Sequence, residues 1–170
     1  MNCLRTRATL AITATLLAVF PGSAVSQQKS LSEQLLGTWT LVSHEAVNPD
    51  GSRFPVYGVS PKGIAIFDAG GHFIIAVMRS DRTKYAIEHP AQGTTEENKV
   101  TAQGTITYFG TYSVREPDRI IAIHIEASSF PNWNGAEQTR GFTIVGDQLT
   151  LTVRALQTGR HAEVTWKRAN

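Results

Sequence analysis

The stretch TRGFTIVGDQLTLTVR, residues 139–154, carries the strongest local signal for a fold in this chain. Gly146-Asp147 suits a two-residue hairpin turn of the primed type, which pairs Val145 with Gln148. Counting outward from that pair puts one set of side chains on the same face: Phe142, Ile144, Leu149, Leu151 and Val153. The opposite face is rich in threonine, so the apolar face must point to a core, and the stretch predicts a half-buried β-hairpin.

The same register places Arg140 on the inner face, beside Phe142. Two interpretations stay open: Arg140 points into the core, or it lies at a rim with its guanidinium in water. An unpaired buried charge costs several kcal/mol, so an inward Arg140 needs a carboxylate or a bound anion as its partner.

Six further predicted strands extend this pattern along the chain. Short segments rich in Val, Ile, Thr and aromatic residues alternate with turn residues, which is typical of an all-β protein. The eight predicted strands are Thr38–Val47, Lys62–Asp68, His72–Arg79, Thr105–Arg115, Arg119–Phe130, Glu137–Val145, Gln148–Leu156 and His161–Lys167. Thr94 and Glu97 form a capping-box pattern that opens one short helix, ending near Gln103, between the third and fourth predicted strands.

Eight sequential antiparallel strands with mostly short turns favour a closed up-and-down β-barrel, in which eight strands leave room for one small ligand. A two-sheet sandwich is the competing architecture. We favour the barrel because the chain lacks the long crossovers that a Greek key requires.

The N-terminal region predicts export. Arg5 and Arg7 precede an apolar run over residues 8–20 that is too short to span a membrane, and small residues follow at Ala24 and Ser26. We therefore expect a secretory signal peptide over residues 1–26 and a secreted or periplasmic protein. Residues 27–34 are expected to form a flexible segment, with a helical turn over residues 32–36, and residues 35–170 to form the barrel domain.

Removal of that signal changes the composition. Arg5 and Arg7 are two of the 16 basic residues, so the 14 that remain equal the 14 acidic residues, and no nucleic-acid partner is expected. Cys3, the single cysteine, is lost as well, which excludes disulfides and a thiol nucleophile. No later run reaches membrane-spanning length, so we expect no membrane insertion after cleavage.

The strand over residues 120–128 leaves its orientation open. Alternation puts three isoleucines on one face and His124, Glu126 and Ser128 on the other. The preceding turn decides which face is inside, because a three-residue loop pairs Tyr112 with Ala122, whereas a four-residue loop pairs it with Ile123. Pro117 excludes a primed turn starting at itself, but it does not choose between these two loops.

Four stretches resemble a known family. They are the Gly-x-Trp segment Leu36–Ser43, Tyr108–Tyr112, the block His124–Trp133 with its His-x-Glu-Ala-Ser and Pro-Asn-Trp sequences, and Gln138–Arg140. Over about residues 35–155 the chain closely resembles the bacterial and fungal lipocalin-like domain family.

That resemblance implies a small β-barrel. It also implies which face of the strand over residues 120–128 points inward. It implies that His124 and Glu126 face the cavity, with Glu126 as the counter-charge of Arg140. It also implies that a late basic residue in the segment 166–168 packs on Trp39. The expected ligand-binding set is Tyr108, Tyr112, His124, Glu126, Ser128, Asn132, Trp133 and Arg140.

These residues support two functions. We expect a binding protein for a small apolar or amphipathic molecule with a polar or anionic group. The alternative is a small isomerase, cyclase or lyase that uses His124, Glu126 and Arg140 for proton transfer. A purely structural polar network is a third interpretation of the same trio.

Other parts of the chain add less. The loop with Trp133 is either a lid or a hydrophobic plug. The His-x-Glu pair lacks further ligands at a suitable spacing, so we expect no metal site, and we expect no cofactor. Neither the ligand's identity nor the oligomeric state follows from the sequence.

Overall fold

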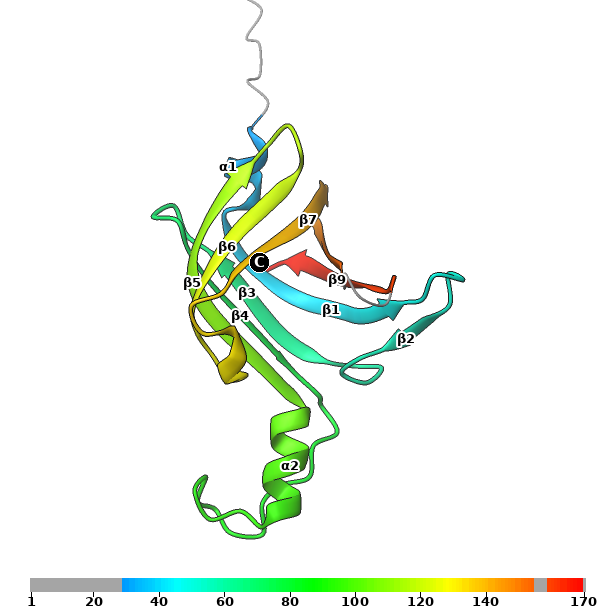
Figure 1. Ribbon diagram of the computed structural model, residues 1–170, viewed down its shortest axis with the longest axis vertical. Coiled ribbons are helices and arrows are strands. Elements are labelled where there is room, and N and C mark those ends of the chain that lie inside the picture. Colours follow the sequence, from blue (N-terminus) through cyan, green and yellow to red (C-terminus); the bar gives the residue numbers. More distant parts are fainter. Residues whose placement is uncertain (1–28, 155–158, 170) are drawn as a thin grey trace, which may run out of the picture.

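The computed structural model describes residues 29–154 and 159–169, so the predicted signal peptide over residues 1–26 lies outside the described residues. The elements, in chain order, are α1 (Leu31–Leu35), β1 (Gly37–Val47), β2 (Arg53–Pro55), β3 (Lys62–Phe67), β4 (His72–Met78), α2 (Thr95–Gln103), β5 (Thr105–Arg115), β6 (Ile120–Ser128), the 3-10 turn η1 (Pro131–Trp133), β7 (Glu137–Val145), β8 (Gln148–Arg154) and β9 (His161–Arg168). All strands belong to one antiparallel sheet (Figure 1).

The β7–β8 hairpin has the predicted register. Val145 pairs with Gln148 around the Gly146-Asp147 turn, and Gly146 adopts a φ of 56° that a primed turn needs. Phe142, Leu149 and Leu151 are buried, as expected for the inner face. The turn chemistry therefore orients both strands correctly.

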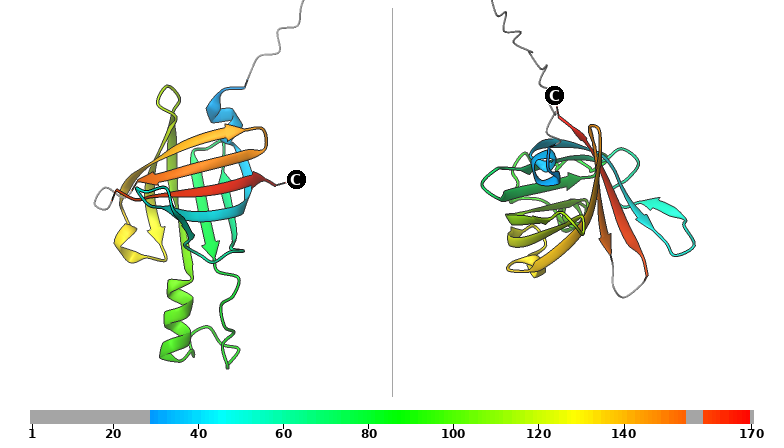
Figure 2. Two further views of the ribbon diagram at one scale, coloured as in Figure 1. Left: turned by 90° about the vertical axis from the view of Figure 1, so that its right-hand side faces the viewer. Right: turned by 90° about the horizontal axis from the view of Figure 1, so that it is seen from above.

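Pairing between β1 and β9 closes the sheet into an eight-stranded barrel made of β1 and β3–β9 (Figure 2). The predicted strand count needs one correction. β2 pairs with the last three residues of β1, beyond the part of β1 that β3 covers. Three residues are too few to show alternation, so this strand was missed, and α2 lies between β4 and β5 rather than between the third and fourth strands of the chain.

The two helices lie at opposite ends of the barrel (Figure 1). The predicted capping box opens α2, because the Thr94 hydroxyl accepts from the backbone N–H of Glu97 and the Glu97 carboxylate accepts from that of Thr94. A second capping box, of Ser30 and Glu33, opens α1, which lies one residue before the helical turn expected over residues 32–36. Neither described helix has the length and apolar character needed to cross a membrane.

The α1 end of the barrel is closed by Trp39. Its indole N–H donates to the carbonyl of Leu35, 2.9 Å away, and both side chains are fully buried. Arg168 lies over the Trp39 ring at 4.2 Å from the ring centroid, which confirms the expected cation–π contact. The Arg168 guanidinium also donates to the carbonyls of Leu36 and Gln34.

Two β-bulges change the direction of side chains. In β1 the pairing with β9 shifts between Leu41 and Ser43, which leaves Val42 as the extra residue. In β6 the pairing with β5 shifts in the same manner and leaves Glu126 as the extra residue. Opposite that second bulge, Gly110 has no room for a side chain, since a Cβ there would lie 1.9 Å from the carbonyl oxygen of His124.

Candidate functional site

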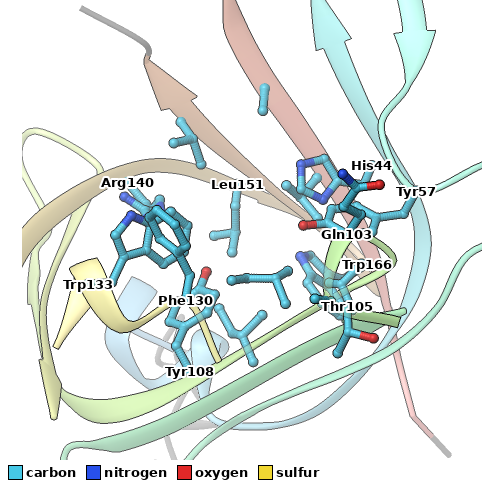
Figure 3. A pocket seen from close by; sticks show the side chains of 17 residues that line it. His44, Tyr57, Gln103, Thr105, Tyr108, Phe130, Trp133, Arg140, Leu151 and Trp166 are labelled. Atoms are coloured by element: carbon cyan, nitrogen blue, oxygen red, sulfur yellow. The ribbon is translucent and has the colours of Figure 1, made fainter. Parts of the chain in front are cut away.

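A cavity of about 320 Å³ lies inside the barrel, toward the α2 end (Figure 3). The side chains that line it are His44, Tyr57, Ile75, Val77, Ala102, Gln103, Thr105, Ile106, Tyr108, Phe130, Trp133, Arg140, Leu151, Val153, Ala162, Val164 and Trp166. Most of them are aliphatic or aromatic, and none is acidic. The cavity thus combines apolar walls with a few polar groups, as small-molecule sites do.

Arg140 is the charged group of this cavity. It projects inward from β7, where it pairs with the buried Ile121, and only 4% of its surface is exposed. Its guanidinium donates to the backbone carbonyl of Thr139 at 3.0 Å and to the side-chain oxygen of Gln138. The Nε–H is buried, and no atom in the described part of the chain accepts a hydrogen bond from it. Among the described residues, no carboxylate forms an ion pair with Arg140.

Tyr108 lies next to this guanidinium. Burial raises the pKa of the Tyr108 hydroxyl above its ordinary value, while the charge of Arg140 and a hydrogen bond with it oppose part of the rise. The Tyr108 ring is held edge-on by Trp133 and Phe73, at centroid distances of 5.4 and 5.8 Å. Tyr108 is therefore a neutral, positioned hydroxyl beside a positive charge.

A second polar group occupies the other side of the cavity. Figure 3 shows His44, Tyr57 and Trp166 together there, across from Arg140 and Trp133. The His44 and Tyr57 rings are 5.0 Å apart, centroid to centroid. Burial lowers the pKa of His44 to about 4, so its imidazole is neutral near pH 7. His44 Nδ1 and Trp166 Nε1 are both buried, and neither has a hydrogen-bond partner within residues 29–154 and 159–169.

The bulge in β1 is what turns His44 inward. Strict alternation from the buried Trp39 and Leu41 puts residue 44 on the outer face. Because Val42 is an extra residue, His44 instead pairs with the buried Val164 and shares its inner face. The predicted site did not include His44, and no turn or glycine in the sequence marks the bulge that turns it inward.

Residues 36–169 match the model of the lipocalin-like domain. The chain belongs to this family. Its lipocalin-like barrel is consistent with binding of a small ligand. Among solved structures, the chain is similar to the fluorescent protein UnaG, with 13% identity and a TM-score of 0.36 for the wild type, over 82% of this chain and 100% of that chain. A point mutant of UnaG gives 11% identity, a TM-score of 0.37 and coverage of 82% and 99%. No curated protein matches the sequence.

Three of the predicted site residues meet at the cavity of this lipocalin-like barrel: Tyr108, Trp133 and Arg140. Tyr112 does not, since its ring packs on Phe67 and its hydroxyl donates to the carbonyl of Asp68 at 2.8 Å. Trp133 is partly buried and lies between Tyr108 and Phe130, so it forms part of the cavity wall.

The expectation that His124 and Glu126 face the cavity is wrong. The His124 ring is 44% exposed, and its Nδ1 lies 2.7 Å from a carboxylate oxygen of Glu137 on the outside of the barrel. Glu126 is exposed, so it is not the counter-charge of Arg140. The cause is the four-residue loop after β5, which pairs Tyr112 with Ile123 and turns the isoleucines of β6 inward.

The remaining predicted residues belong to the loop that follows β6. The bulge at Glu126 puts Ser128 opposite Tyr108, yet the Ser128 backbone N–H donates to Asn134 and its hydroxyl accepts from the N–H of Phe130. Asn132 is exposed on η1 and does not line the cavity. Phe130 does line the cavity, although 47% of its surface is exposed to solvent.

Proposed function

We propose that this protein binds a small amphipathic anion, with a carboxylate at Arg140 and an apolar body in the barrel. One observation carries the proposal: a guanidinium that is 4% exposed lies in the cavity, and the described residues supply neither a partner for its Nε–H nor an acidic side chain in the lining. A charge in such a place costs several kcal/mol unless an anion compensates it.

The neighbours of Arg140 favour a carboxylate. An arginine fork matches the two oxygens of a carboxylate, and the Tyr108 hydroxyl beside it is neutral and able to donate a further hydrogen bond. The other walls, among them Ile75, Leu151 and Val164, suit a hydrocarbon body. The volume of about 320 Å³ is at the lower end for small-molecule sites, so medium-chain acids are suitable probes.

Calorimetric titration with decanoic acid tests this function, with decan-1-ol as the uncharged analogue. The wild type should bind the acid more tightly than the alcohol. Arg140→Met should weaken binding of the acid by roughly 10- to 100-fold, the effect of losing a charged hydrogen bond, and should leave the alcohol unaffected. Arg115→Met, which removes an exposed arginine on β5, serves as the matched control and should change neither.

Two results contradict the proposal. One is the same affinity for acid and alcohol in the wild type. The other is tight binding of the acid by an Arg140→Met variant whose circular dichroism spectrum and melting curve show a folded barrel.

The structure does not bring together the three residues that the enzymatic alternative needs for proton transfer. His124 and Glu126 lie on the outside of the barrel, whereas Arg140 lies inside, so the three groups do not act on one substrate. Binding is therefore the function we propose.

We propose in addition that the protein is exported, on the strength of Arg5, Arg7, the apolar run over residues 8–20 and the small residues Ala24 and Ser26. Intact-mass measurement of the periplasmic or secreted material should give a chain that begins at Val25 or Gln27. A chain there that still contains Met1 refutes export by this signal.

A further inference from the structure

On the side of the cavity away from Arg140, two polar groups have no hydrogen-bond partner among the residues that the structure describes. The indole N–H of Trp166 is buried and finds no acceptor in the described ranges, and Nδ1 of His44 is buried there without a donor or an acceptor as its partner. Trp166 itself is fully buried, and both side chains line the cavity. Buried polar atoms are nearly always hydrogen-bonded, so two such atoms on side chains that line one cavity point to a partner supplied by the ligand of that cavity.

The strand pairing brings these two groups together. His44 is opposite Val164 in the β1–β9 ladder, and Trp166 is two residues further along β9 on the same face. Such diagonal neighbours are within reach of aromatic side chains. Figure 3 shows the two side chains on the same side of the cavity, across from Arg140.

We propose that the ligand carries a second oxygen, remote from its carboxylate, which accepts a hydrogen bond from the Trp166 indole and bonds to His44. The inference rests on the proposed function and narrows it, from an amphipathic acid to an acid with a hydroxyl or carbonyl oxygen toward its far end. An indole N–H only donates, so its partner must be an acceptor.

A neutral oxygen fits this side of the cavity better than a second carboxylate. His44 is kept neutral by its burial, which lowers its pKa to about 4, and the one cation in the described lining, Arg140, lies across the cavity from it. A second anion placed beside His44 would therefore have no cation next to it. A hydroxyl oxygen can accept from Trp166 and donate to the free lone pair of His44, and a carbonyl can accept from both if Nδ1 carries the proton.

The test compares acids that differ by one oxygen. Saturated ω-hydroxy acids, from hexanoic to dodecanoic, are titrated against their parent acids by calorimetry. At the chain length that spans the cavity, the wild type should bind the hydroxy acid about tenfold more tightly than its parent acid, because the hydroxyl forms hydrogen bonds with Trp166 and His44. At other lengths the hydroxyl loses its water and gains no partner, so no such preference is expected.

Two variants test whether Trp166 and His44 cause that preference. Trp166→Phe keeps an aromatic ring and removes the N–H, so it should bind the hydroxy acid and its parent acid with about equal affinity. His44→Phe should reduce the preference as well, and it provides a second route if Trp166→Phe does not fold. Tyr112→Phe, which removes a hydroxyl from a core ring outside the cavity, is the control and should keep the full preference.

The outcomes separate the two proposals. If parent acids bind through Arg140 but no length shows a preference for the hydroxy acid, the second-oxygen inference fails and the proposed function stands. A preference that survives in both Trp166→Phe and His44→Phe also overturns it. If neither series binds, the proposed function fails, and the inference fails with it.

Discussion

At the scale of single residues, His44 shows how the cavity controls charge. Its imidazole lies against the Tyr57 ring and faces apolar walls, and burial lowers its pKa from 6.5 to about 4. As the pH falls, His44 is therefore protonated near pH 6.5 in the unfolded chain, but only near pH 4 in the folded barrel. Acid favours unfolding over that range, and the stability due to neutral His44 is present above it.

This gives a prediction for the pH dependence of stability. Relative to His44→Phe, the free energy of unfolding of the wild type should fall by up to about 3 kcal/mol between pH 6.5 and pH 4, then stay level below that range. Urea unfolding at a series of pH values measures it. The other histidines titrate in both proteins and cancel in the difference. Parallel curves for the two proteins would mean that His44 is ordinarily solvated.

Arg140 and Glu126 show what could be predicted for single positions. The inner face was predicted correctly for Arg140 from the Gly146-Asp147 turn, because a two-residue loop fixes the register of each residue pair counted away from it. Glu126 was placed wrongly, because its strand follows a loop whose length the sequence leaves open between three and four residues. A family resemblance then favoured the wrong face, since a motif can recur for reasons other than a cavity.

At the scale of elements, strict alternation fails at the two bulges. The extra Val42 turns His44 inward, and the extra Glu126 puts Ser128 opposite Tyr108. Strict alternation, counted from either end of these strands, assigns side chains to the correct face as far as the bulge. Beyond the bulge it assigns them to the wrong face. Gly110 is the one local signal of the second bulge, because only a residue without Cβ tolerates the carbonyl of His124 so close to its backbone.

Other elements were predictable because their signals are local. The capping box of Thr94 and Glu97 specifies where α2 begins, with both reciprocal hydrogen bonds present. β2 was not predictable, because it is a three-residue extension that depends on the end of β1 being free of β3. The cavity itself is lined from six strands, from α2 and from loops. Sequence reasoning therefore reached only those lining residues that a hairpin register or a motif had already marked.

At the scale of the whole molecule, the barrel has one closed end and one end with a cavity. The closed end joins the two termini of the domain, since α1 precedes β1 and Arg168 ends β9 (Figure 2). The cavity lies toward α2, at the other end, and shares no lining residue with the closure. Stability and binding should therefore respond to different substitutions.

Arg168→Met tests this separation. The substitution removes the guanidinium 4.2 Å from the Trp39 ring centroid and its hydrogen bonds to Leu36 and Gln34, so the free energy of unfolding should fall by about 2–4 kcal/mol. Lys167→Met, an exposed neighbour on the same strand, should change it by less than about 0.5 kcal/mol. Both values come from urea denaturation at pH 7.

Binding is the second half of that experiment. Folded Arg168→Met should retain the wild-type affinity for decanoic acid, because Arg168 contacts the carbonyls of the α1 segment and not the cavity. A loss of affinity in proportion to the loss of stability would show instead that the closed end holds the cavity in shape. Unchanged stability would show that the barrel closes through its β1–β9 ladder alone, with the cation–π contact as a consequence of closure rather than a cause.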